Sequence, residues 1–238
     1  MNPAAHSDRE RRILSLWERA VCRGRWDRDD ALLADAGRLP GLGDRNRELL
    51  AMRAALFGRN WLLRSDCPTC AAESEFPIDA LGLAEALKRA PVDGSGGGTV
   101  EWNGRVIVVR APTADDLRSI AAQDDIEDAA QALLATCIPP DMGAEPLSEE
   151  DIGLLERRIE SLDPAAIVSF ALACPACGHE WTSPLDVADA LWTELKRAAE
   201  RSFTDVDALA RTYGWTEEQV IDLSPVRRAA YLQLVAAP

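Results

Sequence analysis

Four of the six cysteines occur in two copies of one short motif. The stretches "DCPTCAAESEFPIDALGLA" (66–84) and "ACPACGHEWTSPLDVADAL" (173–191) share the pattern C-P-x-C-x-x-E-x-x-x-P-[IL]-D at an offset of 107 residues. A tight C-P-x-C turn directs two thiolates at one metal ion, and two such turns complete a closed tetrahedral site of the structural type. The motif therefore predicts one structural zinc ion shared by Cys67, Cys70, Cys174 and Cys177.

The long sequence separation between the two motifs does not prevent them from sharing an ion. Closing a loop of about 100 residues costs the unfolded chain about 4.7 kcal/mol, whereas a structural zinc ion contributes about 10–16 kcal/mol in small peptides. A small residue after the second cysteine eases the exit from the turn. Gly178 suits this position well and Ala71 suits it less, so the first turn is the weaker of the two.

Other readings of the cysteines remain open. A thioredoxin-type redox pair should follow a strand and open a helix, whereas "GHEWTS" and "AAESEF" read as strands or hairpin arms. Four buried cysteines without metal are a second alternative, and iron instead of zinc is a third. We expect His179 at the surface, and Cys22 and Cys137 in the core of helical faces.

The remaining sequence predicts a predominantly helical α+β fold. Apolar residues at helical spacing predict a first helix whose buried face carries Ile13, Leu16, Trp17, Ala20 and Val21. Further helices are expected at 27–37, 43–58, 81–90, 147–163 and 184–214. In the helix at 43–58 we expect Asp44 as the N-cap and Gly58 as the C-cap.

The middle of the chain gives the clearest strand signal. Asn103-Gly104 lies between two β-rich arms and predicts a type I′ hairpin near residues 99–110. One long helix, begun by Thr113, is expected to run on to residue 138, and "PVDGSGGG" (91–98) has the composition of a flexible linker. The apolar stretch 165–174 is either a strand or a buried helix.

Five segments follow from this pattern within what we expect to be one compact domain. They are an N-terminal helical segment (1–64), the first zinc knuckle with its helix (65–92), a hairpin and helical middle (93–164), the second zinc knuckle with its helix (165–200), and a C-terminal short-helix docking module (201–238).

The C-terminal module carries strong helix signals and many apolar groups. Thr216 with Gln219 predicts a capping box, and Ser224-Pro225 predicts the start of a last helix. The apolar side chains either pack on the preceding helix or dock a partner. In the second case Trp215, Arg227, Arg228 and Tyr231 would be the anchors. A DNA-reading helix-turn-helix is a weaker alternative in so acidic a chain.

The order of these features resembles a family of baseplate proteins, or baseplate hub assembly chaperones, of contractile-tail phages and extracellular contractile injection systems. The resemblance covers about residues 11–235. It is carried by "LWERA", by "RNRELLAMRAALFG" leading into "CPTC", by "RAPTADDL", by "CPACGHEW" with "LDVADALWTEL", and by "YGWTEEQVIDLSP". It implies a non-enzymatic role in building the baseplate or hub of a phage-tail-like particle, with other baseplate or hub proteins as partners.

Composition limits the remaining function classes. A net charge of -14 argues against a general nucleic-acid binder. No apolar run is long enough to span a membrane, and no secretory signal is evident, so we expect a cytoplasmic protein that is incorporated into the particle or leaves it after assembly. No catalytic residues are predicted, because neither histidine has a nucleophile at a telling spacing. A zinc-ribbon adaptor in transcription or RNA handling, and a thiol oxidoreductase, are the alternatives.

Overall fold

The structure is a computed structural model that describes residues 3–87, 97–140, 142 and 147–236. The chain forms two compact units. The terminal unit consists of Met1–Ala34 and Ala188–Pro238, and the central unit consists of Asp35–Val187. This grouping crosses the five sequential segments, because the first (1–64) and the fourth (165–200) are each divided between the two units.

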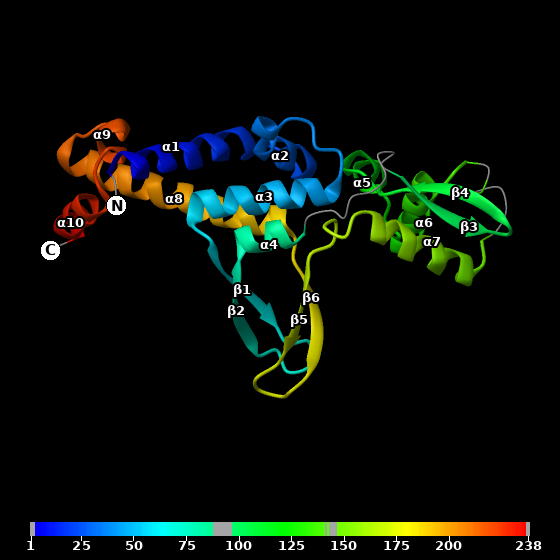
Figure 1. Ribbon diagram of the computed structural model, residues 1–238. Helices are drawn as coiled ribbons and strands as arrows, with labels where there is room; N and C mark the ends of the chain where they lie inside the picture. Colours follow the sequence, from blue (N-terminus) through cyan, green and yellow to red (C-terminus); the bar gives the residue numbers. More distant parts are fainter. Residues whose placement is uncertain (1–2, 88–96, 141, 143–146, 237–238) are drawn as a thin grey trace. The chain divides into compact units, whose positions relative to one another are not determined.

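The terminal unit is built of helices alone within its described residues. Helix α8, from its second residue on, lies beside α1 in Figure 1, and the contact between them includes the Trp17 and Phe203 rings at a centroid distance of 4.9 Å. The helices are α1 (Pro3–Ala20), α2 (Arg25–Leu32), α8 (Val187–Tyr213), α9 (Glu217–Ile221) and α10 (Pro225–Ala236).

The buried face expected for the first helix is correct except at its end. Ile13, Leu16 and Ala20 are buried. Val21 is 39% exposed because α1 ends one residue before it. The prediction that Cys22 lies in the core is wrong for the same reason, since this residue follows the helix and its side chain is exposed.

In its described residues, the central unit combines helices with three separate two-stranded antiparallel sheets, β1–β2, β3–β4 and β5–β6. The strands are β1 (Asn60–Asp66), β2 (Glu73–Asp79), β3 (Gly97–Trp102), β4 (Arg105–Arg110), β5 (Ser169–Ala173) and β6 (Glu180–Pro184). The helices are α3 (Leu42–Phe57), α4 (Ala80–Ala86), α5 (Ala114–Ile120), α6 (Ile126–Cys137) and α7 (Glu149–Leu162), and a 3₁₀ turn, η1 (Ala34–Ala36), crosses the unit boundary. The chain is therefore mostly helical with small antiparallel hairpins, and the stretch 165–174 contributes a strand.

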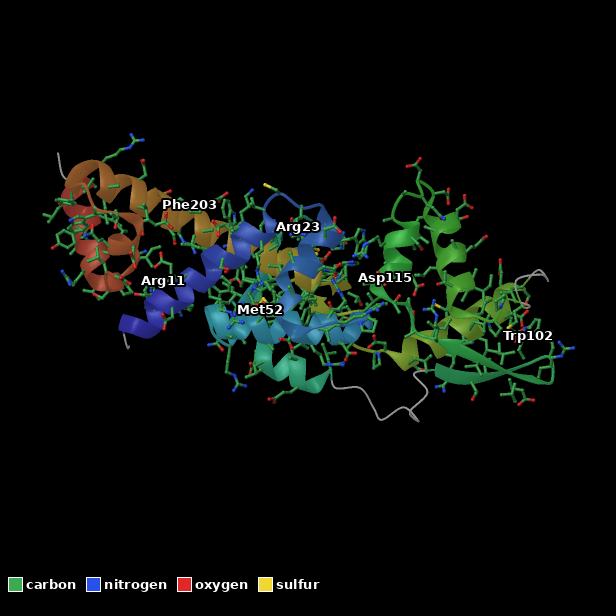
Figure 2. The ribbon with its side chains drawn as sticks, turned by 90° about the horizontal axis from the view of Figure 1, so that it is seen from above. Arg11, Arg23, Met52, Trp102, Asp115 and Phe203 are labelled. Atoms are coloured by element: carbon green, nitrogen blue, oxygen red, sulfur yellow. The ribbon has the colours of Figure 1, made fainter. Side chains whose placement is uncertain are left out.

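The hairpin predicted around Asn103-Gly104 is confirmed as β3–β4. Both turn residues have positive φ, 47° and 72°, as a type I′ turn requires. Trp102, at the turn end of β3 (Figure 2), donates from its indole N–H to the Asp151 carboxylate at 2.9 Å. One face of this hairpin packs on α7 around a core of Val100, Trp102, Ile107, Val109, Cys137, Ile138, Met142, Leu155, Ile159 and Leu162. The prediction that Cys137 is buried is correct.

The single long helix expected after this hairpin is wrong. Thr113 does begin a helix, with a complete capping box to Asp116, but α5 ends at Ile120. Asp125 then caps α6, because its carboxylate accepts from the backbone N–H of Glu127 at 2.8 Å and of Asp128 at 3.1 Å. An aspartate with this geometry favours a helix start over a helix interior.

The prediction that Asp44 caps α3 is also wrong, although Gly58 does end that helix, with a φ of 93°. The N-cap of α3 is Gly41, three residues before Asp44, and it has no side chain to offer as a cap. Instead, the buried Asp163 carboxylate accepts from the Gly43 N–H at 2.8 Å. A distant side chain thus takes the role that sequence reasoning gave to a local one.

Two further points concern the chain as a whole. The expected linker lies outside the described residues except for its last two glycines, which begin β3. Among the helices that the structure describes, none combines the length and the apolar character needed to cross a bilayer.

Candidate metal centre

The first cysteine motif forms the turn of the hairpin β1–β2. The backbone N–H of Cys67 donates to the Ala72 carbonyl at 3.0 Å, and the N–H of Ala71 donates to the Cys67 carbonyl at 2.9 Å. These two bonds close a tight loop with both cysteines at its end. Ala71 is held at a φ of 56°, in the left-handed region that favours glycine.

The second motif forms the turn of β5–β6 in the same way. The N–H of Cys174 donates to the His179 carbonyl at 2.8 Å, and the N–H of Gly178 donates to the Cys174 carbonyl at 2.9 Å. Gly178 has a φ of 74° at the position that Ala71 occupies in the first turn. The repeated sequence therefore encodes the same backbone turn twice, as the shared spacing predicted.

The repeated motif also ends in the same way in both copies. Asp79 directly precedes α4, and its carboxylate caps that helix by accepting from the Gly82 N–H. Asp186, its counterpart, directly precedes α8. Each hairpin thus leads from its cysteine turn into a helix one residue after the motif, as expected from the sequence.

The two hairpins, here called the cysteine arms, lie side by side with their turns at the same end (Figure 1). Along all four strands the side chains alternate between more buried and more exposed positions. Two contacts join the less exposed faces of the arms. Ser65 and Ser183 share a hydrogen bond of 2.9 Å, and the Phe76 and Phe170 rings lie 5.3 Å apart between centroids.

At the turns, the four sulfur atoms converge. The Sγ atoms of Cys67 and Cys177 are 3.7 Å apart, those of Cys70 and Cys174 are 3.6 Å apart, and all four lie within 4.8 Å of one another. A tetrahedron with metal–sulfur bonds of about 2.3 Å has sulfur–sulfur edges of about 3.8 Å. The sulfurs thus have the spacing that a metal ion would need, and the four cysteines could hold one.

Backbone N–H groups and neighbouring thiols act on these sulfurs in opposite directions. Donation from the Cys177 N–H, and then from the Ala176 N–H, lowers the pKa of Cys174 to about 7 against the effect of burial. At Cys177 the N–H of His179 lowers the pKa, but Cys70, burial and the other thiols outweigh it and raise the pKa to about 12. The four thiols cannot all ionise at this spacing without a cation among them, because four negative charges would repel one another.

The four cysteines differ in their exposure to solvent. Cys67 and Cys174, the first cysteine of each turn, are 2% and 3% exposed, whereas Cys70 and Cys177 are exposed. His179 lies at the surface next to the second turn, as expected, and it does not belong to the cluster. Among the cysteine, histidine and acidic side chains of the described residues, these four cysteines are placed so that they could together hold a metal ion.

Arg53 holds the root of the first arm, and sequence reasoning did not single it out. Its buried guanidinium donates to the carbonyls of Gly58 at 2.6 Å and Asn60 at 2.8 Å. It also lies over the Trp61 ring, 4.9 Å from the centroid. The residue caps the end of α3 and orients the start of β1. An arginine shortly before a helix-ending glycine is the one signal that could have indicated this role.

The residues expected to bind a partner all lie in the terminal unit. Trp215 and Tyr231 are half-buried and form an aromatic cluster with Tyr213, with ring centroids 4.8–5.7 Å apart. They pack around a small core of Leu209, Val220 and Leu223. Arg227 is exposed.

Arg228 has a different environment from Arg227. Its buried guanidinium makes a bidentate ion pair with Glu10, at 2.7 and 2.6 Å, and approaches Asp205 at 3.6 Å. Glu10 also accepts from the Ser202 hydroxyl at 2.7 Å. Arg228 therefore joins α10 to α1 and α8, and it is not available as a surface anchor.

The Glu10 carboxylate stays ionised in this buried setting. Burial raises its pKa, but hydrogen bonds from Arg228 and Ser202, together with the positive charge of Arg228, outweigh that effect and lower the pKa below its usual value. Burial raises the pKa of Asp205 more than Arg228 lowers it. The arginine is thus paired with Glu10 above all.

No protein-family model, curated protein or solved structure matches this chain. The chemistry of the site and the surface of the terminal unit are therefore the observations on which a functional proposal rests.

Proposed function

We propose that this protein is a non-enzymatic interaction protein with a structural zinc ion. We propose further that it acts as an assembly factor or minor structural component of the baseplate or hub of a phage-tail-like contractile injection system. The observation that carries the first proposal is the convergence of four cysteine sulfurs at tetrahedral spacing. The second proposal is supported by the resemblance of the cysteine motifs and the C-terminal motif to those of the baseplate protein family.

The donor set and its surroundings favour a structural ion over a catalytic one. A catalytic zinc keeps an open coordination position for water or substrate, whereas four thiolates close the tetrahedron. Backbone N–H groups of Cys177 and Ala176 reach the Cys174 sulfur, and those of Cys70 and Thr69 reach the Cys67 sulfur. Such donors offset the negative charge of bound thiolates.

The arms also argue against the oxidoreductase alternative. Each C-P-x-C pair lies in a hairpin turn between two strands, and neither pair opens a helix. A helix N-terminus is the element that usually lowers the pKa of a redox-active cysteine pair. The nucleic-acid alternative is disfavoured because a protein with a net charge of -14 repels the phosphate backbone.

The outer face of α10 is our choice for the docking surface. The inner face of this helix carries Arg228 and Tyr231, which pack within the terminal unit. The outer face presents Val226, 80% exposed, and Leu234, 65% exposed, with Arg227 beside them. Val226 and Leu234 are eight residues apart, so they lie on one side of the helix. Large exposed apolar side chains at this spacing are typical of a helix that packs against another protein.

Metal analysis of the purified full-length protein tests the zinc proposal. We expect about one zinc ion per chain and its loss in Cys174→Ser, while Cys22→Ser, which alters an exposed cysteine outside the site, retains the metal. Iron in place of zinc, or no metal in the wild type, would contradict the proposal.

Affinity purification from the native host tests the setting. We expect baseplate, hub or tube proteins to co-purify with the wild type and to be lost in Val226→Asp and Leu234→Asp. The matched control is Val106→Asp on β4, where a valine that is 72% exposed is replaced outside α10. Co-purification of transcription or ribosomal proteins instead, or unchanged binding in the α10 variants, would refute this part.

A further inference from the structure

The metal centre exposes one sulfur of each turn and buries the other. Cys70 and Cys177 are open to solvent, whereas Cys67 and Cys174 are almost completely covered. The two cross-arm pairs whose sulfurs lie 3.7 and 3.6 Å apart each combine one of each kind: Cys67 with Cys177, and Cys70 with Cys174. An oxidant in solution therefore reaches a sulfur whose neighbour on the other arm is already in contact with it.

We propose that the four cysteines are also a thiol–disulfide site, which a hydroperoxide oxidises to two crosswise disulfides, Cys67–Cys177 and Cys70–Cys174, with release of the ion. The inference rests on the proposed zinc site for the ion that is released. It goes beyond that site in assigning the oxidised state and its pairing. In this oxidised state the two arms stay joined, now by disulfide bonds in place of the metal ion.

The contacts between the arms favour crosswise pairing. The Ser65–Ser183 hydrogen bond and the Phe76–Phe170 ring contact join the strands of one arm to those of the other, and neither depends on a metal ion. The crosswise sulfurs have to close from 3.7 and 3.6 Å to a bond of about 2.05 Å, a movement that side-chain rotation can supply. The arms need not separate for either bond to form.

The chemistry balances with peroxide as the oxidant. The exposed thiolate of Cys70 attacks one peroxide oxygen, becomes a sulfenic acid and releases hydroxide. The buried thiolate of Cys174 then attacks that sulfur, forms the disulfide and expels a second hydroxide. Cys177 and Cys67 react in the same way. In sum, four thiolates and two peroxides take up four protons and give two disulfides and four waters, and the divalent cation leaves.

The pairing has a structural consequence. Disulfides within each turn, Cys67–Cys70 and Cys174–Cys177, would leave the two arms without a covalent or metal link. Crosswise disulfides keep a cross-link between the same two segments that the ion joins. The arms are thus held together in the reduced, metal-bound state and in the oxidised, metal-free state.

Tryptic mapping of the full-length protein, with fragmentation of the linked peptides, distinguishes the three pairings that four cysteines allow. Trypsin releases Cys67 and Cys70 together in the peptide 65–88, and Cys174 and Cys177 together in the peptide 159–196, because neither stretch contains an internal lysine or arginine. After peroxide treatment and digestion without reductant, we expect the two peptides as one linked species, with fragmentation that assigns both crosswise bonds. A zinc-binding dye should report full release of the metal, and dithiothreitol with added zinc should reverse both changes.

Several outcomes would overturn the inference. Two separate peptides, each with an internal disulfide, would refute the crosswise pairing, as would peptides linked through Cys67–Cys174 and Cys70–Cys177. Sulfinic or sulfonic acids in place of disulfides would refute it as well. Retention of zinc at peroxide concentrations that oxidise the exposed Cys22 would refute the accessibility of the site. Metal analysis before oxidation tests the proposed zinc ion separately, since the peptide pairing can be read whatever the metal content.

Discussion

The two cysteine turns differ at one position, and substitutions at that position should have opposite effects on stability in the two turns. Ala71 and Gly178 occupy the same place after the second cysteine, and both have positive φ. We expect Ala71→Gly to stabilise the central unit and Gly178→Ala to destabilise it. A Cβ at Gly178 would meet no other atom within 4 Å, so the expected cost comes from the backbone alone.

The magnitude follows from two opposing terms. An alanine in the left-handed region costs about 1–2 kcal/mol in the folded state. A glycine there avoids this cost but adds about 0.4–1 kcal/mol of conformational freedom to the unfolded chain. The net effect is about 0.5–1 kcal/mol in favour of glycine at either position. For a unit of this size, the corresponding shift of the melting temperature is about 1–4 °C.

Differential scanning calorimetry of the zinc-loaded, full-length protein measures both shifts. The relevant transition is the one that a chelator moves. The double variant Ala71→Gly/Gly178→Ala should melt close to the wild type, because the two effects have similar size and opposite sign. A lower melting temperature for Ala71→Gly, or shifts of the same sign for both single variants, would refute the equivalence of the two turns.

Three further predictions concern charged side chains. The Arg59 guanidinium and the helix N–H groups lower the pKa of Asp79 to about 2. The stabilising effect of the Asp79 carboxylate is therefore present above pH 4 and lost as pH falls toward 2. In Arg59→Gln, an NMR titration should show the midpoint of Asp79 rising toward the ordinary value of about 4. Glu10→Gln should destabilise the terminal unit by about 3 kcal/mol in urea unfolding, because it leaves the buried charge of Arg228 without its main partner. Asp163→Ala should cost about 1 kcal/mol and increase amide exchange in the first turn of α3, and unchanged exchange there would contradict its capping role.

The cysteine cluster could be predicted from the sequence because its determinants are local and occur twice. The spacing within each motif fixes the turn, and the matching flanks predict that both copies leave the turn in the same way. The β3–β4 hairpin and the caps at Thr113 and Thr216 were predictable for the same reason. In each case a few neighbouring residues determine the backbone conformation.

Long-range pairing could not be predicted in this way. The Asp163 carboxylate meets the Gly43 N–H across 120 residues, and Arg228 meets Glu10 across 218. Among 40 acidic and 26 basic side chains, nothing in the local sequence says which carboxylate meets which donor. The missed N-cap of α3 follows directly from this limit.

Two neighbouring arginines illustrate the same limit at close range. Arg227 and Arg228 are adjacent and chemically identical, yet one is exposed and the other is buried. Successive helix positions differ by about 100°, so the orientation of α10 on its neighbours decides which arginine faces inward. That orientation depends on Glu10, far away in the sequence. The expectation that both arginines anchor a partner therefore gave one role to two residues that have different environments in the fold.

The metal centre and the proposed docking surface belong to different units, and this gives a last prediction. Isolated two-stranded hairpins are marginally stable in water, and the cysteine arms have strands of only five or seven residues. The arms should therefore depend on the cross-link at their turns. The terminal unit has its own core around Leu209 and its own buried ion pair, so removal of zinc should leave α10 in place. We expect a chelator to increase amide exchange in β1, β2, β5 and β6, with little change in α1 and α10. A partner held by α10 should then bind the chelated protein with unchanged affinity in calorimetric titration. A loss of binding on chelation would mean that the arms themselves contact the partner, and that the metal does more than hold them together.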